Sequence, residues 1–230
     1  MLELRDVHAS YGPFRALFGV RLEVGAGEAV ALVGPNGAGK TTVARVASGL
    51  VRPSAGAVLV DGTDFTGTVA HRFVRAGISH APEGRSVLAT LSVEENLALS
   101  FRRVVGRSGL AGALDRAYGF FPVLGQRRSQ AAGTLSGGEQ RMLSMARVLV
   151  EVPKVLIADE LSLGLAPKIV DELYASLDRL RGEGTALLIV EQQVGHALAI
   201  ADRVAVLAHG TISWTGSSAE ADTVVQRAII

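Results

Sequence analysis

A glycine-rich segment contains the first residues suited to chemistry. Apolar residues 30–33 precede this segment, and residues 42–50 after it have helical character. Backbone N–H groups of such a loop converge on phosphate oxygens, and the N-terminus of the following helix adds positive potential. The strand and helix on either side are the context that a phosphate-binding loop requires. The predicted nucleotide contacts are Gly34, Pro35, Asn36, Gly37, Ala38, Gly39, Lys40, Thr41 and Thr42.

Two side chains of this loop are expected to contact the ligand directly. The Lys40 ammonium can reach the terminal phosphates of a nucleotide, and the Thr41 hydroxyl can bind Mg²⁺. A nucleoside phosphate with Mg²⁺ is therefore the predicted ligand of this loop. The competing interpretation is a glycine-rich turn with an exposed lysine, which the flanking strand and helix disfavour.

A pair of adjacent carboxylates, Asp159 and Glu160, ends a second apolar run. A buried parallel strand brings Asp159 to the carboxyl edge of the sheet, where the glycine-rich loop also opens, and a carboxylate there can hold Mg²⁺. Glu160 is then placed to orient or deprotonate an attacking water. A solvated turn after the strand is the alternative, and the nearby phosphate-binding loop disfavours it.

Composition limits the remaining possibilities. The chain has 230 residues, of which 48% are hydrophobic, so it can bury enough apolar surface to fold. Its formal net charge of +1 argues against a protein that mainly coats nucleic acid, although a local basic patch stays possible. Cysteine is absent, which removes disulfides and thiolate chemistry. The mean hydropathy is +0.32, yet no apolar run reaches the roughly 18 residues of a membrane span.

Strand-like and helix-like segments alternate, which predicts a largely parallel sheet covered by helices. Capping boxes begin helices at Ser92 and Ser136, and Pro167 opens another helix, with Gly182 just beyond its end. Residues 84–130 contain no convincing strand, so we expect a helical insertion there. The predicted strands cover residues 28–33, 57–61, 154–158, 185–190 and 203–207, with an N-terminal strand at 2–7 pairing with 21–24.

The run Leu-Ser-Gly-Gly-Glu-Gln-Arg at residues 135–141 lies between the two candidate sites. With it, the whole chain resembles the ATP-binding subunits of ABC transporters. The resemblance implies an α/β P-loop NTPase fold with a mainly parallel core sheet, an N-terminal antiparallel β subdomain and a helical subdomain. It also implies one nucleotide-binding domain over residues 1–230, with the helical subdomain at approximately 84–140 inserted in a RecA-like core.

The same resemblance assigns roles to further residues. It implies a head-to-tail dimer in which Ser136, Gly137, Gly138 and Glu139 close on ATP held by the other subunit. An ordinary capping box without a ligand is the alternative for these four. Tyr11 matches the aromatic that stacks on adenine, and a packed turn aromatic is its alternative.

Three positions depart from the common family pattern. Leu161 replaces the proline that usually follows the Asp-Glu pair. Glu83 stands where most members have a glutamine that touches Mg²⁺, and it can still accept from a metal-bound water. Gln192 stands where most have a histidine near the γ-phosphate; its amide can donate a hydrogen bond but cannot become positively charged.

Four short motifs together resemble one of the two ATPase subunits of importers for branched-chain amino acids. They are Pro-Glu-Gly-Arg at residues 82–85, Leu-Ser-Val-Glu-Glu-Asn-Leu at 91–97, Ser-Leu-Gly-Leu-Ala-Pro at 162–167 and Val-Glu-Gln at 190–192. The resemblance implies a second ATPase subunit in a homo- or heterodimer, two transmembrane permease subunits and a periplasmic or extracellular solute-binding protein. It places the chain on the cytoplasmic face of the membrane, with Arg-rich residues 84–130 as the dock; a solvated helical face is the rival interpretation. No nucleic acid is expected. The alternatives are an importer ATPase for urea or short amides, a soluble ABC ATPase without transport, and a regulatory nucleotide binder without turnover.

Overall fold

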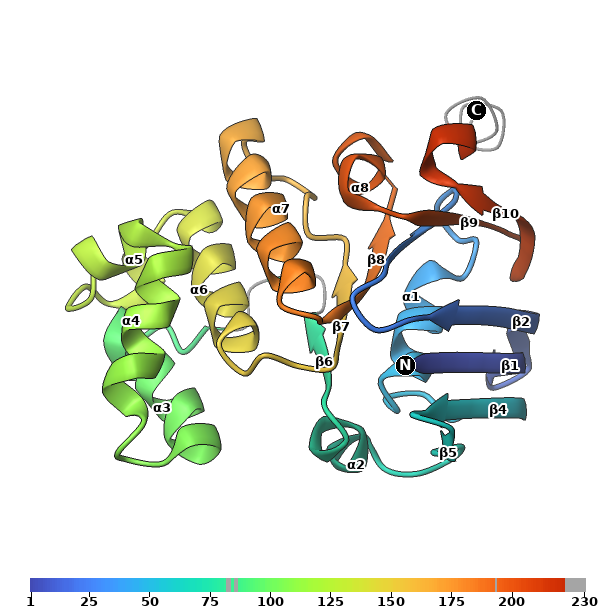
Figure 1. Ribbon diagram of the computed structural model, residues 1–230, viewed down its shortest axis with the longest axis horizontal. Coiled ribbons are helices and arrows are strands. Elements are labelled where there is room, and N and C mark those ends of the chain that lie inside the picture. The colour runs from blue at the N-terminus through green and yellow to red at the C-terminus, as the bar shows by residue number, and fades with distance from the viewer. Residues whose placement is uncertain (82–83, 85–86, 193, 222–230) are drawn as a thin grey trace. The chain divides into compact units, whose positions relative to one another are not determined.

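The computed structural model describes residues 1–81, 84, 87–192 and 194–221, and they form two compact units (Figure 1). We call them the core unit and the helical unit. The core unit comprises the described residues within Met1–Pro82, Pro153–Ser162 and Arg181–Ile230. The helical unit comprises those within Glu83–Val152 and Leu163–Leu180.

The candidate site residues of the core unit lie at strand ends of a six-stranded sheet. Its order is β10-β9-β3-β8-β7-β6, and neighbours are parallel except for the antiparallel pair β9 and β10. Every residue of β3, β7 and β8 is buried, as expected for strands covered on both faces. The strands are β3 (Ala29–Val33), β6 (Ile78–Ala81), β7 (Val155–Asp159), β8 (Ala186–Glu191), β9 (Arg203–Ala208) and β10 (Thr211–Ser217).

The core unit also contains a four-stranded antiparallel sheet of order β2-β1-β4-β5. Helix α1 (Lys40–Ala47) contacts β1 and β2 of this sheet and β7 and β8 of the other, so one hydrophobic core joins both sheets through the helix. The strands are β1 (Leu2–Tyr11), β2 (Phe14–Val24), β4 (Ala55–Val60) and β5 (Thr63–Asp64). Two short helices follow in the chain: α2 (Ala70–Arg75) lies between β5 and β6, and α8 (Val194–Ile200) lies between β8 and β9.

The helical unit contains no strand longer than an isolated bridge, between Ser92 and Ala131, among its described residues. Both predicted capping boxes are present, at Ser92 for α3 and at Ser136 for α6. Helix α3 contacts α4 and α6, and α5 contacts α4 and α6. The helices are α3 (Val93–Val105), α4 (Leu110–Phe120), α5 (Pro122–Gln126), α6 (Gly137–Leu149) and most of α7 (Pro167–Gly182), with a 3₁₀ turn, η1 (Ala132–Thr134).

The sequence-based expectations agree with this architecture in outline and differ at several boundaries. The fold class is confirmed. The strand expected at 57–61 ends at Val60, because Asp61 has φ 49° and Gly62 φ 76°, which turn the chain into β5. Helix α7 includes Gly182 rather than ending before it. The domain limits, one domain over 1–230 with a helical insertion at about 84–140, stay a prediction.

Three strands were missed by the sequence analysis. β5 has two residues, β6 has a polar Ser-His pair, and β10 alternates exposed with half-buried residues instead of forming an apolar run. Among the described residues, no helix has both the length and the apolar character needed to cross a membrane.

Candidate functional site

The glycine-rich loop connects β3 to α1 at the carboxyl edge of the six-stranded sheet. Gly34 has φ 156°, and a Cβ atom there would lie 2.1 Å from the backbone oxygen of Leu207. A Cβ on Gly39 would lie 3.0 Å from the backbone oxygen of Ala16 in β2. These close approaches allow the loop to sit between β9 and β2 only with glycine at both positions.

Lys40 lies inside this loop, and its side chain is folded against the backbone. Its ammonium donates to the carbonyl oxygens of Gly34 at 2.8 Å and Pro35 at 3.1 Å. Burial lowers the pKa of Lys40, while the negative charges of Glu160 and Asp159 act in the opposite direction. Lys40 is therefore within electrostatic reach of both carboxylates.

The other loop residues differ in their accessibility. Asn36 and Gly37 are exposed at the tip of the loop, and Pro35 and Thr41 are half-buried. Ala38 and Thr42 are buried, so their side chains pack inward and only their backbone groups are available to a ligand. Gly37 and Gly39 have φ 78° and 107°, in the left-handed region that favours glycine.

The two adjacent carboxylates are held differently. Asp159 is the last residue of β7 and only 1% exposed. Glu160 has φ 46°, unusual for a residue with a side chain, and its backbone N–H donates to Val190 of the neighbouring strand β8 at 2.9 Å. The left-handed residue turns the chain sharply at the sheet edge. Leu161, where the family pattern has proline, is buried with 1% exposure and so anchors this turn by packing.

Gln192 lies in a bend directly after β8 and is half-buried. The residue before it, Glu191, was missed by the sequence analysis. Its carboxylate is 2% exposed and accepts hydrogen bonds from Ser162, from the backbone N–H at 3.0 Å and from the hydroxyl at 2.9 Å. A carboxylate at the end of an apolar strand is the same signal that identified Asp159, so the sequence could have revealed it.

Tyr11 ends β1 at the turn that leads into β2, and it is 43% exposed. It is paired across the hairpin with Phe14, which is 77% exposed. An aromatic this accessible is available to a planar ligand.

The signature residues belong to the helical unit. Ser136 is exposed at the N-cap of α6; its hydroxyl accepts from the backbone N–H of Glu139 at 3.3 Å, and the Glu139 carboxylate accepts from the Ser136 N–H at 2.8 Å. Gly138 packs closely on Ile169, since a Cβ there would lie 3.1 Å from that side chain. The first turn of α6, with Gly137, is thus fixed by capping and packing.

One predicted metal contact is not placed by the structure. Glu83 lies outside the described residues. Within the described ranges, no cluster of three His, Asp or Glu side chains could hold a metal ion alone. Together the described core residues form an edge with a buried ammonium, a hydroxyl and two carboxylates, which is suited to a phosphate ligand with a divalent cation.

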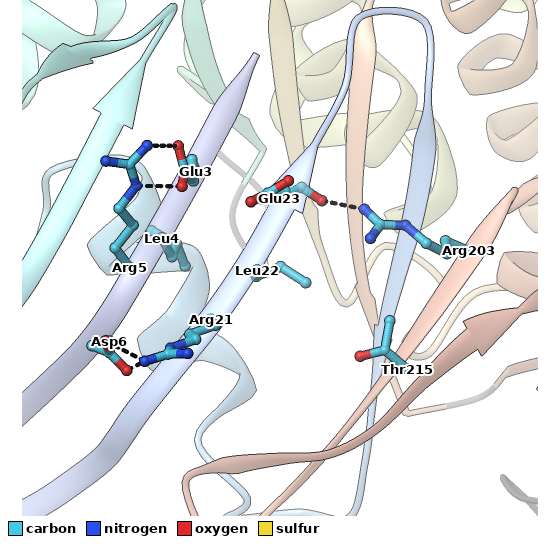
Figure 2. A pocket seen from close by; sticks show the side chains of 9 residues that line it. All are labelled: Glu3, Leu4, Arg5, Asp6, Arg21, Leu22, Glu23, Arg203 and Thr215. Atoms are coloured by element: carbon cyan, nitrogen blue, oxygen red, sulfur yellow. Dashed lines mark hydrogen bonds and ion pairs between the residues drawn. The ribbon is translucent and has the colours of Figure 1, made fainter.

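A hollow of about 530 Å³ lies elsewhere in the core unit, lined by residues of β1, β2, β9 and β10 (Figure 2). Its charged side chains pair with one another: Arg5 with Glu3, and Arg21 with Asp6 at 2.6 Å (Figure 2). Arg203 donates to the Glu23 backbone oxygen at 2.6 Å. The hollow is not lined by the glycine-rich loop, Asp159 or Glu160, so it is distinct from the candidate site.

Known proteins resemble this chain over most of its length. The family described as "ABC transporter" matches residues 17–162. The chain is 40% identical to the high-affinity branched-chain amino acid transport ATP-binding protein BraG of Pseudomonas aeruginosa, covering 92% of this chain and 91% of that protein. It is 34% identical to the probable branched-chain amino acid transport ATP-binding protein LivF of Archaeoglobus fulgidus, covering 96% and 93%.

Solved structures also match. An ATP-binding cassette of an ABC transporter in its ADP conformation has a TM-score of 0.85 and 25% identity, covering 98% of this chain and 94% of that one. Transporter ATP-binding proteins whose names give other solutes match the chain as well.

Proposed function

The chain belongs to the ATP-binding subunits of ABC transporters and hydrolyses ATP, and from this premise we propose that it powers import of branched-chain amino acids. The observation that carries the choice of solute is the 40% identity to a branched-chain amino acid transport ATP-binding protein over 92% of this chain. The LivF match supports the same assignment.

The glycine-rich loop is proposed to bind the nucleotide phosphates. Backbone N–H groups of residues 34–39 and the N-terminus of α1 supply donors, and Lys40 exchanges its carbonyl partners for terminal phosphate oxygens. Tyr11, exposed at its hairpin, stacks on the adenine. The buried position of Lys40 strengthens its attraction for phosphate, because little water screens the charge.

Mg²⁺ fits the oxygen donors of the same edge. The Thr41 hydroxyl and the Asp159 carboxylate are hard ligands of the kind that Mg²⁺ prefers, with nucleotide phosphates completing the set. When bound, the ion neutralises charge on the transferring phosphoryl group. Glu83 is proposed as a further contact on the resemblance alone, since it lies outside the described residues.

Hydrolysis is proposed to use Glu160 and Gln192. The left-handed backbone of Glu160 sets its carboxylate at the end of β7, where it can orient a water and accept its proton. The Gln192 amide, at the end of neighbouring β8, donates a hydrogen bond toward the γ-phosphate. The contact of Glu191 with Ser162 ties these two strand ends together.

We further propose that two ATPase subunits form a head-to-tail dimer, either two copies of this chain or this chain with a paralogue. Ser136, Gly137, Gly138 and Glu139 begin α6, whose first N–H groups are suited to bind the γ-phosphate of ATP held by the other subunit. The accessible N-cap serine supports this assignment.

Two membrane permease subunits and an external solute-binding protein complete the proposed importer. Helix α3 of the helical unit exposes Leu99, Val104 and Val105, at 60%, 48% and 36%. Exposed apolar side chains on one helix favour a protein partner over a merely solvated face. Docking there would hold the chain at the cytoplasmic face of the membrane.

Purification of the tagged chain from membranes tests the assembly directly. We expect membrane subunits to co-purify, and the complex in lipid vesicles with its solute-binding protein to hydrolyse ATP faster when leucine, isoleucine or valine is added. Lys40→Ala should abolish that rise. Stimulation by urea or a short amide instead would replace the proposed solute. Isolation without membrane subunits, with salt-sensitive RNA binding, would contradict a transport role.

A further inference from the structure

Glu191, the last residue of β8, holds the turn that carries Glu160. Its carboxylate accepts the Ser162 backbone N–H on Oε1 at 3.0 Å and the Ser162 hydroxyl on Oε2 at 2.9 Å. The Glu160 backbone N–H donates to the Val190 carbonyl oxygen at 2.9 Å. Residues 160–162 are therefore fastened to the end of β8 at three points, and two of them require the Glu191 side chain.

The turn has a backbone conformation that depends on such contacts. Glu160 has φ 46°, in the left-handed region, where a residue with a Cβ atom is strained. Conformations of this kind persist when the surrounding structure holds them in place. Leu161 contributes packing, whereas the hydrogen bonds of Ser162 fix the direction in which the chain leaves the turn. The position of the Glu160 carboxylate therefore depends on a contact made two residues later in the chain.

Stability alone does not account for a carboxylate at the end of β8. Glu191 is 2% and Ser162 8% exposed, and removing a carboxylate from water is unfavourable unless its oxygens are hydrogen-bonded. Replacing a buried polar pair by apolar side chains of similar shape is often neutral or stabilising. An apolar pair lacks direction, however, whereas two hydrogen bonds to one carboxylate define both the distance and the orientation of Ser162.

We propose that Glu191 is a positioning residue for hydrolysis, which acts through the 160–162 turn and keeps the Glu160 carboxylate where it can activate water. The inference rests on the proposed role of Glu160 as the base. A displacement of about 1 Å in an active site can cost on the order of 10²-fold in rate, so a small relaxation of this turn would lower turnover. The glycine-rich loop and Tyr11 lie outside the turn, so ATP affinity would change little.

A second role for Glu191 has to be separated from this one. Burial lowers the pKa of Lys40, and the negative charge of Glu191 is among those that oppose this shift. A role as counter-charge to Lys40 would depend on the charge and would alter ATP affinity. Positioning of Ser162 depends instead on hydrogen bonds, which an uncharged amide can also make, since its oxygen accepts from the N–H and its NH₂ group donates to the hydroxyl oxygen.

Turnover and ATP affinity of the full chain, measured well below its unfolding temperature, test the proposal. Glu191→Met removes both acceptors, and we expect kcat to fall about 10- to 100-fold with ATP affinity within about threefold of the parent. Glu191→Gln can keep both contacts and should recover most of that loss. Equal losses of turnover in the two variants, or a loss of ATP affinity in both, would assign the effect to the charge and overturn the proposal.

Thr185→Val is the matched control. The Thr185 hydroxyl is buried, at 2% exposure of the residue, and donates to the Pro153 carbonyl oxygen at 2.8 Å. Thr185 directly precedes β8 and Pro153 lies shortly before β7, so this contact joins the same two strands at their amino ends, away from the site. We expect Thr185→Val to be less stable but to turn over like the parent. A loss of turnover equal to that of Glu191→Met would indicate general weakening of the sheet and overturn the positioning role.

Ser162→Ala keeps the carboxylate and removes one of the two donors. We expect its kcat to fall less than that of Glu191→Met and its ATP affinity to stay near that of the parent. If Glu191→Met does not fold, the comparison of Ser162→Ala with Thr185→Val decides, and equal turnover in these two variants would overturn the proposal.

A variant of Glu160 separates the inference from its premise. In a Glu160→Gln background, Glu191→Met should cause no further loss of turnover, because it acts through Glu160; losses that multiply would overturn this route. If Glu160→Gln turns over like the parent, the proposed base and the role of Glu191 both fail. If Glu160→Gln lowers turnover while folded Glu191→Met and Ser162→Ala do not, the base stands and the role of Glu191 is overturned.

Discussion

The buried carboxylate of Glu191 accepts both hydrogen-bond donors of Ser162, the backbone N–H at 3.0 Å and the hydroxyl at 2.9 Å. Glu191 ends β8, and Ser162 follows Glu160 by two residues. The contact therefore fixes the chain segments that carry Glu160 and Gln192 at adjacent ends of the sheet.

Ser162→Ala should destabilise the protein, because one donor to a buried carboxylate is lost. Hydrogen bonds to charged groups contribute about 1.5–3 kcal/mol, and we expect a decrease of that size in the free energy of unfolding, measured with urea. Ser176→Ala is the control, since Ser176 is also buried but donates to the Glu172 backbone carbonyl within α7. Its loss should be smaller, because alanine has the higher helix propensity. Equal effects of both substitutions would contradict the assigned importance of the Glu191 contact.

Gly34→Ala should disrupt the phosphate-binding loop. The added Cβ would lie 2.1 Å from the Leu207 backbone oxygen, so β9 or the loop must move, and we expect a loss above about 3 kcal/mol or failure to fold. Gly37→Ala is the matched change in the same loop; a Cβ there meets nothing within 4 Å, and only the positive φ is unfavourable. That change should cost roughly 1 kcal/mol in thermal unfolding. A loss of stability for Gly34→Ala no larger than that for Gly37→Ala would contradict the close approach of Gly34 to the Leu207 backbone.

Tyr11→Ala should weaken ATP binding by about 1–3 kcal/mol, the usual contribution of an aromatic stacked on a base. Tyr11→Phe should retain most of the affinity, because stacking needs the ring and not the hydroxyl. Phe18→Ala is the control, an aromatic with 44% exposure against 43% for Tyr11. Titration with a fluorescent ATP analogue measures all three. Equal weakening by Phe18→Ala would remove Tyr11 from the adenine site.

The ion pair of Asp61 with Lys154 should contribute a small, pH-dependent stability. The Lys154 ammonium and the N-terminal ammonium of Met1 lower the pKa of Asp61 from 3.8 to about 2. A lowered pKa stabilises the folded state above pH 3.8, and this contribution is lost as the pH falls through about 2. Because the Asp61 side chain is 46% exposed, solvent screening keeps the effect below about 1 kcal/mol.

Lys154→Met measures this contribution. Its free energy of unfolding should fall below that of the parent at pH 6, and the difference should shrink in acid or in high salt. A difference that is the same at pH 2 and pH 6 would assign the effect to packing of the lysine stem.

Much of this architecture could be predicted from local patterns. Strands β3, β7 and β8 are buried on both faces, so each appears in the sequence as a continuous apolar run and can be predicted from it. The capping boxes at Ser92 and Ser136 depend on residues three positions apart, so they are also visible in the sequence.

Features that depend on distant residues could not be predicted. Strand β6, with Ser79 and His80, forms only because β7 lies beside it, and its Ile-Ser-His-Ala run has no strand pattern. The approach of Gly34 to Leu207 and the proximity of His80 to Asp159 join segments far apart in the chain. Such contacts are set by tertiary packing, which no local period encodes.

The central claim is that Glu160 activates the attacking water at the carboxyl edge of β7. Phosphate release by the purified protein, with Glu160→Gln beside the exposed control Glu183→Gln, tests it most directly. We predict that Glu160→Gln lowers turnover by about 10²–10⁴-fold with ATP affinity retained, and that Glu183→Gln turns over like the parent. Lys40→Ala sets the background rate. Turnover by Glu160→Gln equal to that of the parent would contradict the claim.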